Sequence, residues 1–560
     1  MNSRFLLALV LTAVVIVVTP LLFPGSLKRT PAVLTDSTAH VIDMTPGNRK
    51  AATNSDTVLP AFGAVSPPPL PGAVPETSTV HAPGARYTLN SVGAAPSSIL
   101  LDNYPSQRKG SAPESVQLVG RREPLISYKL AMGVDTVRLD TVLFRVEQRA
   151  QPNSSLSFLG TAAGHVVAIK YDFPKDTANA YLVHLSARVE NAPTGTRLII
   201  GLPRTLYANE ADTADDMNHL AVSYRTSRGD VSSVAFAKLD TTEVRREAGP
   251  ITWAATRNKY FVVVYRSITT PFSLLELRGL PRTGKVAENM IGNVSLPLSS
   301  DGTAAFDVYA GPQSFSRLQQ LGGDLDQVNP YAGLLHGVVQ PFTKIVMKAL
   351  LWMKHTTQLN YGWVLVLFGI MIRLVLWPLN QSAMRTSMKM QRLQPELQAL
   401  QKKYSDDPKK QQEAVMKVYK DHGMSPLSPL MGCLPMLLPM PVLFALYQVF
   451  QNTIEFRGVP FLWLADISQR DPFFITPVLM GVSMFAMSWI GMRNSPPNPQ
   501  AKMMSYMMPV MLTVLFLNFA SGLNLYYAVQ NVAAIPQQWL LARERGKQSV
   551  AIVQPAKRRA

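Results

Sequence analysis

Apolar residues are spread unevenly along the chain, and their spacing separates membrane-like segments from soluble ones. The first apolar run covers residues 5–23 and would form about 28 Å of helix, close to the thickness of the hydrocarbon core of a bilayer. A signal-peptide core is shorter, roughly 7–15 residues, and no small-x-small cleavage site follows the run. We therefore predict that residues 1–23 form an uncleaved membrane anchor, with a cleaved signal peptide as the alternative.

Two kinds of soluble sequence follow this run. Residues 24–86 are rich in Pro, Ala, Thr and Ser, a composition that buries too little apolar surface to fold, so we predict a flexible linker. After it, apolar and polar positions alternate, as in residues 137–146 and 181–189, and Gly, Pro, Asn and Asp separate the alternating runs. Such a period of two is typical of strands with one buried face. We predict a large antiparallel β-sandwich domain over residues 87–325.

The last part of the chain returns to apolar runs of helical length. Residues 326–357 carry apolar side chains at spacings of three and four with lysines on the other face. This pattern predicts an amphipathic helix in the membrane interface, and the alternative is a helix packed on the soluble domain. Further spans are predicted at residues 361–379, 427–450 and 473–492, and two more within 503–541.

The run at 503–541 is too long for one span and must break, and the turn residues Ala520, Ser521 and Gly522 mark the break. The fold class is therefore a polytopic α-helical membrane protein of six spans. Residues 358–541 form a five-helix core, and the large β-sandwich is attached to it.

Charge predicts the orientation of these spans. The chain has a net charge of +18, and its basic clusters lie beside the apolar runs. The loop 380–426 holds nine Lys and Arg, and the tail 542–560 is also basic, whereas the loop 451–472 has more acidic than basic residues. The positive-inside rule then places both termini in the cytoplasm and the β domain in the periplasm of a bacterial inner membrane.

The loop 380–426 has a helical pattern of its own. Asp407 is a good N-cap and Pro408 suits the first position of a helix, so we predict a helical hairpin that turns here and ends at Gly423. Its basic face is either simply solvated or receives a nascent chain or ribosomal RNA, and the sequence leaves both open.

Arg373 is the most informative residue of the predicted spans. It lies within its span, about 9 Å along the helix axis from the cytoplasmic end. A charged side chain at the bilayer centre costs about 2.5–3.5 kcal/mol to insert. No Asp or Glu occurs within any predicted span to pair with it. We expect Arg373 to face a water-filled cavity between helices, and the alternative is that it reaches lipid phosphate. The last two spans add polar walls: Asn518, Ser521, Asn524, Tyr526, Tyr527, Gln530 and Asn531.

Catalytic and metal-binding patterns are missing from the sequence. No P-loop, GxGxxG, GxSxG or HExxH is present, so we expect no enzymatic activity, no cofactor and no metal. The single cysteine, Cys433, excludes an intramolecular disulfide, and we interpret it as an inert buried thiol. Two other functions remain as alternatives: a secondary transporter of an anionic solute, and a membrane-anchored periplasmic protein that binds or modifies sugars.

Several short motifs stand out when the whole chain is considered. They are Asn360-Tyr361-Gly362-Trp363, Arg373, Pro378-Leu379, Leu393-Gln394-Pro395, Gly432-Cys433-Leu434-Pro435, Met440-Pro441, the run from Ser521 to Tyr527, and Lys259-Tyr260-Phe261 after Trp253. Together they resemble the motifs of the YidC/Oxa/Alb insertases, in the Gram-negative form with a large periplasmic domain. The sequence departs from the family pattern at Pro439, where a glutamine is common, and before that span, where the approach is longer.

The resemblance implies a function, a site and partners. Members insert and help to fold membrane proteins, alone or beside the Sec translocon, through a groove open to the cytoplasm and to lipid. The expected partners are nascent membrane proteins, the Sec translocon with its accessory subunits, the lipid bilayer, and the ribosome through the cytoplasmic loops and tail. The predicted substrate groove is lined by Arg373, Gly369, Met480, Leu515, Asn518, Asn524, Tyr526 and Tyr527.

Overall fold

The computed structural model describes most of the chain from residue 74 onward. The described residues are 74–110, 114–120, 124–148, 155–281, 287–329, 336–404, 407–422, 440–492 and 499–553. All of them belong to one compact unit, Val65–Ala560. The predicted anchor 1–23, most of the predicted linker, Cys433, Pro439 and the end of the basic tail lie outside the described residues.

Four antiparallel strands form the smaller of two sheets. In spatial order they are β1 (Thr77–Ala82), β2 (Ala85–Asn90), β3 (Ala95–Pro105) and β4 (Ser115–Gln117). β1 buries every second side chain and turns into β2 at Gly84, whose φ of +79° suits glycine. The β domain therefore starts at Thr77, before residue 87, because a Ser- and Thr-rich strand resembles the linker composition that precedes it.

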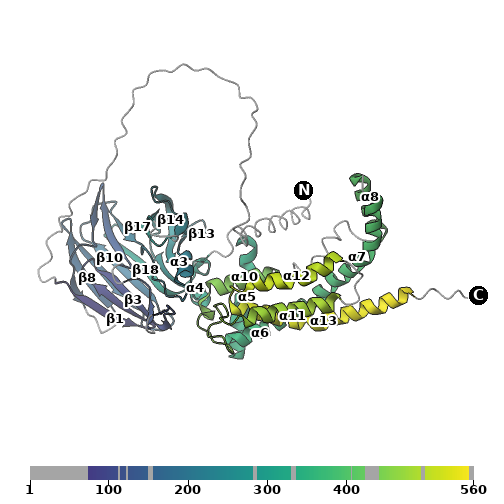
Figure 1. Ribbon diagram of the computed structural model, residues 1–560. Coiled ribbons are helices and arrows are strands. Elements are labelled where there is room, and N and C mark those ends of the chain that lie inside the picture. The colour runs from purple at the N-terminus through teal and green to yellow at the C-terminus, as the bar shows by residue number, and fades with distance from the viewer. Residues whose placement is uncertain are drawn as a thin grey trace, which may run out of the picture. The chain divides into compact units, whose positions relative to one another are not determined.

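The larger sheet has fourteen strands, all paired antiparallel. Figure 1 labels β8, β10, β14, β17 and β18 among them. Its path runs β6-β5-β11-β17-β16-β14-β15-β18-β10-β9-β8-β7, and β12 pairs with β14 and β13. The strands are β5 (Ser127–Met132), β6 (Asp135–Arg138), β7 (Arg145–Gln148), β8 (Ser155–Ala162), β9 (His165–Asp172), β10 (Leu182–Val189), β11 (Arg197–Gly201), β12 (Ala221–Thr226), β13 (Val231–Ala235), β14 (Arg245–Arg257), β15 (Phe261–Ser267), β16 (Phe272–Gly279), β17 (Met290–Pro297) and β18 (Thr303–Pro312).

Side chains from both sheets share one apolar core. The rings of Tyr87 in β2 and Phe173 after β9 lie 5.2 Å apart, and the hydroxyl of Tyr171 donates to the carbonyl oxygen of Ala94 at 2.7 Å. β8 alternates strictly between half-buried and buried positions, as its period of two requires. The prediction of a β-rich domain of antiparallel sheets is confirmed.

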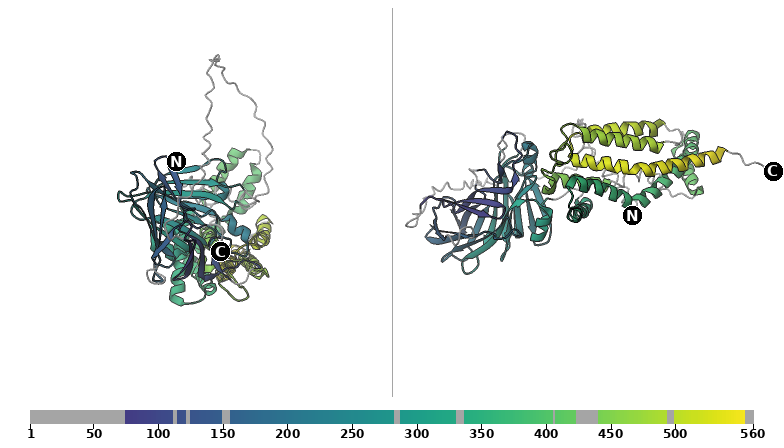
Figure 2. Two further views of the ribbon diagram at one scale, coloured as in Figure 1. Left: turned by 90° about the vertical axis from the view of Figure 1, so that its left-hand side faces the viewer. Right: turned by 90° about the horizontal axis from the view of Figure 1, so that it is seen from below.

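Helices make up most of the chain after the last strand. They are α4 (Phe315–Leu321), α5 (His336–Thr357), α6 (Tyr361–Val375), α7 (Trp377–Lys403), α8 (Pro408–Asp421), α10 (Met440–Asn452), α11 (Ile475–Met492), α12 (Pro499–Phe516) and α13 (Ser521–Val553), with the short α3 (Thr213–Asn218) inside the β domain. α13 packs beside α11 and α6, and α11 packs against α12. Figure 2 shows α13 as the long yellow helix among these helices.

Two helices lie in the basic loop, where the sequence predicts a helical hairpin, and the predicted end at Gly423 lies outside the described residues. α7 ends at Lys403, and α8 begins at Pro408 with the side chain of Asp407 accepting from the backbone N–H of Lys410. Buried apolar side chains of the two helices, among them Leu397 and Tyr419, pack together.

The helices after the β domain begin and end at other residues than the predicted spans. α12 and α13 are separate helices that meet at residues 517–520, which confirms the predicted break. α11 is long and apolar enough to cross a membrane alone, and α5 with α6 forms an apolar pair bent by 118°. The interfacial helix 326–357 stays a prediction. Among the described helices α11 is the one that meets this length and hydropathy criterion alone, so the described residues do not confirm six spans. The predicted span 5–23 and the first part of the predicted span 427–450 lie outside the described residues.

The loop between α10 and α11 makes buried contacts with the β domain. Arg457 donates from Nε to Glu210 Oε1 at 2.7 Å, and both side chains are almost completely buried. Glu455 accepts from the backbone N–H of Phe315 at the start of α4, at 3.0 Å. Burial raises the pKa of both Glu210 and Glu455 to about 7.

Candidate functional site

Arg373 lies in the last turn of α6 with its side chain half-buried. Its Nη2 donates to Oε1 of Gln537 in α13 at 2.7 Å. Its Nε is buried and has no hydrogen-bond partner in the described part of the chain, and Arg373 forms no ion pair there. A desolvated cation held by a neutral amide keeps its capacity to bind an anion.

One helical turn before Arg373 in α6, Gln530 of α13 joins two of the predicted groove residues. Its Nε2 donates to the carbonyl oxygen of Gly369 in α6 at 3.2 Å and to the hydroxyl of Tyr526 at 2.9 Å. Gly369 allows the helices to approach, since a Cβ there would lie 3.1 Å from Cγ1 of Val529. Gly369 and Tyr526 therefore meet at the contact between α6 and α13.

Met480 lies on another side of α13, in α11. Its carbonyl oxygen accepts from Nδ2 of Asn531 at 3.4 Å and from the hydroxyl of Ser483 at 2.8 Å. Asn531 also donates to Ser483 Oγ at 3.2 Å. The side chain of Met480 is buried, so this residue contributes packing between α11 and α13.

Three further predicted residues surround Phe516 at the end of α12. Nδ2 of Asn524 donates to the carbonyl oxygen of Phe516 at 3.1 Å, and the rings of Phe516 and Tyr527 lie 5.7 Å apart. Leu515 packs against the same buried cluster. Asn524 is fully buried and its Oδ1 has no partner within the described residues. These residues connect α12 with the start of α13.

Asn518 is placed differently from the other predicted residues. It is exposed in the turn between α12 and α13 and lines a polar cavity of about 590 Å³. Other residues around this cavity come from the β domain and from the loop after α10, including Lys259, Glu210 and Arg470. The structure therefore does not bring Asn518 to Arg373.

Gln537 is the residue of this site that the sequence pattern did not single out. It follows Gln530 by seven positions and Tyr526 by eleven, so the three share one face of α13. That spacing, in a run otherwise rich in apolar residues, is the signal that could have found it. We use the name polar cluster for Arg373, Gly369, Tyr526, Gln530 and Gln537.

The chemistry of the polar cluster is that of a binding surface. It offers one cation, amide groups and a hydroxyl, and the described residues contain no group of His, Cys, Asp and Glu able to hold a metal. Such groups can hydrogen-bond to polar or acidic side chains of a passing chain. They provide no nucleophile paired with a base.

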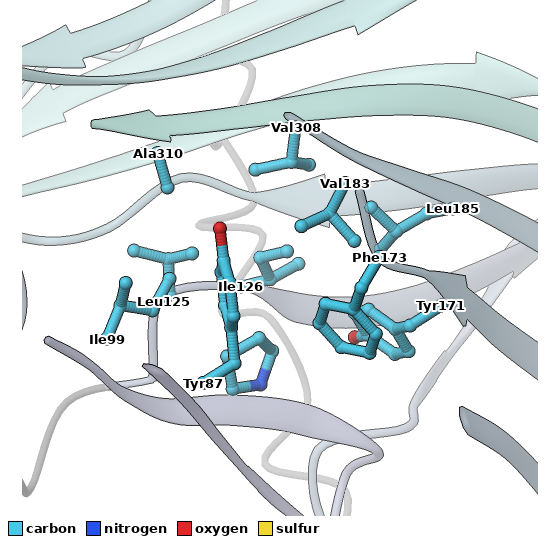
Figure 3. Close-up of a pocket in the computed structure, with 11 residues that line it drawn as sticks. Tyr87, Ile99, Leu125, Ile126, Tyr171, Phe173, Val183, Leu185, Val308 and Ala310 are labelled. Carbon is cyan, nitrogen blue, oxygen red and sulfur yellow. The ribbon is translucent and has the colours of Figure 1, made fainter. Parts of the chain in front are cut away.

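The β domain contains a small apolar cavity between its sheets (Figure 3). Its volume is about 10 Å³, enough for at most one water molecule. Figure 3 shows the ring of Tyr87 extending into it beside Ile126 and Val308. This cavity is therefore too small and too apolar to hold a sugar.

Both the helical part and the β domain of the chain match known protein families. Residues 352–548 match the family of the 60Kd inner membrane protein, and residues 77–345 match the YidC periplasmic domain. The "Membrane protein insertase YidC" of Nitratidesulfovibrio vulgaris is 32% identical over 406 residues, which are 70% of each chain. That of Azotobacter vinelandii is 29% identical over 421 residues, 75% of this chain and 70% of the relative.

One solved structure is also matched. The crystal structure of an active YidC insertase with its first transmembrane domain resolved is matched over 83% of this chain and 92% of that chain, with 18% identity and a TM-score of 0.33. The names of the relatives support the insertase interpretation over the transporter and the sugar-modifying enzyme. The chain therefore belongs to the YidC family of membrane protein insertases, inner-membrane proteins with a β-rich periplasmic domain.

Proposed function

We propose that the polar cluster receives the hydrophilic flank of an incoming membrane protein and that Arg373 attracts acidic residues of that flank. The observation that carries this proposal is the half-buried guanidinium, which has a neutral partner in Gln537 and a buried Nε without one. A fixed carboxylate would satisfy the charge permanently, whereas this arrangement leaves it available to a transient anion. Substrates of the family, nascent membrane proteins, carry such flanks beside their apolar spans.

The polar cluster would shorten the distance over which a polar flank must cross hydrocarbon. An Asp or Lys at the centre of a span costs about 2.5–3.5 kcal/mol, so hydrated polar groups partway across the membrane lower the barrier for a polar flank. The apolar segment then moves into lipid and gains about 0.3–0.6 kcal/mol for each Leu, Ile, Phe or Val. This gain drives release without nucleotide, which agrees with the absence of a nucleotide-binding motif from the sequence.

We also propose the topology and the finer partners expected from the sequence. Both termini lie in the cytoplasm, six spans cross the membrane, and residues 1–23 form the first. The basic hairpin 380–426 and the tail 542–560 bind the ribosome, and the core works alone or beside the Sec translocon. Ribosome binding that weakens steeply with salt and is reduced when the tail is removed would support the electrostatic contact, and salt-insensitive binding would contradict it.

Insertion into liposomes tests the central proposal. The purified full chain is reconstituted and presented with a freshly synthesised single-span protein that carries a short acidic tail, and protease protection reports insertion. Arg373→Ala should reduce insertion roughly tenfold, the equivalent of one charge-assisted hydrogen bond, and Arg373→Lys should retain most of it.

Further measurements distinguish the contribution of the Arg373 charge from that of the other polar groups. A matched substrate with a neutral tail should insert equally well with the natural chain and with Arg373→Ala. If Arg373→Ala inserts the acidic tail as well as the natural chain, the charge has no part in insertion. A requirement for added ATP would contradict the account of release.

A further inference from the structure

Gln537 is almost completely buried in α13, and its side chain is the one described partner of the Arg373 guanidinium. Buried amides in a membrane protein need partners at both ends, because hydrocarbon supplies none. Oε1 of Gln537 accepts from Nη2 of Arg373 at 2.7 Å. The amide therefore contacts the charge that the proposed function assigns to substrate binding.

The other end of the amide fixes its orientation. Nε2 of Gln537 donates to the carbonyl oxygen of Trp377, where α7 begins, at 3.1 Å, and lies 3.4 Å from Oε1 of Gln381. Turning the amide over would place its oxygen against two oxygens and its NH₂ against the guanidinium. Both contacts would be repulsive, so Oε1 must face Arg373.

A neutral acceptor also has a consequence for the charge. A glutamate at this position would form an ion pair with Arg373 and satisfy its charge, and an apolar residue would leave the guanidinium without its anchor. Glutamine does neither, because it holds one Nη while Nε has no partner among the described residues.

We infer that Gln537 is a positioning residue that holds the Arg373 guanidinium in place by a neutral hydrogen bond and keeps its positive charge available to the acidic flank of a substrate. This inference rests on the proposed function of Arg373. It goes beyond that function by assigning the selectivity for acidic flanks to residue 537, which must both hold the guanidinium by a hydrogen bond and carry no charge.

The test uses the full chain in liposomes with the acidic-tailed and neutral-tailed substrates. Gln537→Glu should lower insertion of the acidic tail roughly tenfold, to the level of Arg373→Ala, because it cancels the charge. Gln537→Met, which removes the anchor at similar volume, should also lower it. Both variants should insert the neutral tail like the natural chain. Adding Gln537→Met to Arg373→Ala should cause no further loss, because Gln537 acts through Arg373.

The neighbour Gln538 gives a matched control, and Gln538→Met should insert both substrates like the natural chain. Gln537→Glu with natural activity on the acidic tail would overturn the inference. Equal losses on both tails would show a merely structural role and would also overturn it. If Arg373→Ala lowers acidic-tail insertion and the Gln537 variants do not, the inference fails while the proposed function stands. If Arg373→Ala has no effect, the proposed function itself fails.

Discussion

Asp216 is a buried carboxyl of the β domain, and its replacement by asparagine should change how folding depends on pH. It lies in α3 and is 1% exposed. Its Oδ2 accepts from the backbone N–H of Asn209 at 3.0 Å and from Nδ2 of Asn258 at 3.3 Å, and Oδ1 accepts from the backbone N–H of Lys259 at 3.2 Å. It thus connects α3 to two segments, one at Asn209 and one at Asn258 and Lys259.

Two effects on this carboxyl oppose each other. Burial favours the neutral form, and the hydrogen-bond donors with the nearby Lys259 favour the ionised form. Burial is the larger effect and raises the pKa of Asp216 from 3.8 to about 6. The difference of about two units corresponds to about 3 kcal/mol.

The sign follows from proton linkage. Because the pKa of Asp216 is higher in the folded chain, the folded state binds the proton more tightly than the unfolded state. The stabilisation is therefore complete below pH 3.8, the ordinary pKa, and is lost as the pH rises through about 6. Between pH 4 and pH 7 the natural β domain should lose about 2–3 kcal/mol through this group.

Asp216→Asn removes the titration and keeps the shape. An amide has one acceptor oxygen where the carboxyl has two, so one donor loses its partner at a cost of about 1–3 kcal/mol. This cost does not change between pH 4 and pH 7. The change of the unfolding free energy with pH therefore reports on the buried carboxyl, whereas the constant difference in stability between the two proteins does not.

The unfolding free energy can be measured in urea on the full chain in nanodiscs. Trp253 is the one tryptophan of residues 77–312, so the fluorine signal of fluorotryptophan at this position reports on the β domain. The exposed Glu243→Gln serves as a control and should keep the natural slope. An Asp216→Asn variant with the natural slope, or with a steeper loss of stability from pH 4 to pH 7, would refute the reasoning.

Three further predictions concern packing and pairing. A Cβ at Gly481 would overlap the hydroxyl oxygen of Thr513, so Gly481→Val should separate α11 from α12. The variant should lose about 1–3 kcal/mol of folding free energy and melt at a lower temperature in the full chain. An unchanged melting temperature would show that the two helices do not pack this way. Arg457→Ala at pH 8 leaves Glu210 buried without its partner and should lower the free energy of unfolding by about 3–5 kcal/mol. Adding Glu210→Gln to this variant should recover part of the lost melting temperature. No recovery would argue against the ion pair. Trp253→Phe removes a hydrogen bond of 2.7 Å to a backbone carbonyl and should cost the β domain at least about 1 kcal/mol in urea unfolding.

Local patterns predicted the elements because they depend on neighbouring residues. The alternation of buried positions in β8, the cap of α8 at Asp407 and Pro408, and the break before Ser521 all follow from periods and propensities within a few residues. The burial of Arg373 also follows from its position within an apolar run. The same rules failed at β1, where a Ser- and Thr-rich strand resembles a linker.

Only the tertiary structure decided which strands pair and which residues distant in sequence are in contact. β18 pairs with β10 and β15, which are far from each other in sequence, since the pairing is set by which apolar faces meet in the core. The partner of Arg373 is Gln537, 164 residues along the chain. The position of Asn518 at a separate cavity depends on how α12 and α13 turn. The sequence by itself therefore determined the kinds of element, the family and the buried charge, whereas the packing of distant helices decided which neutral amide holds that charge.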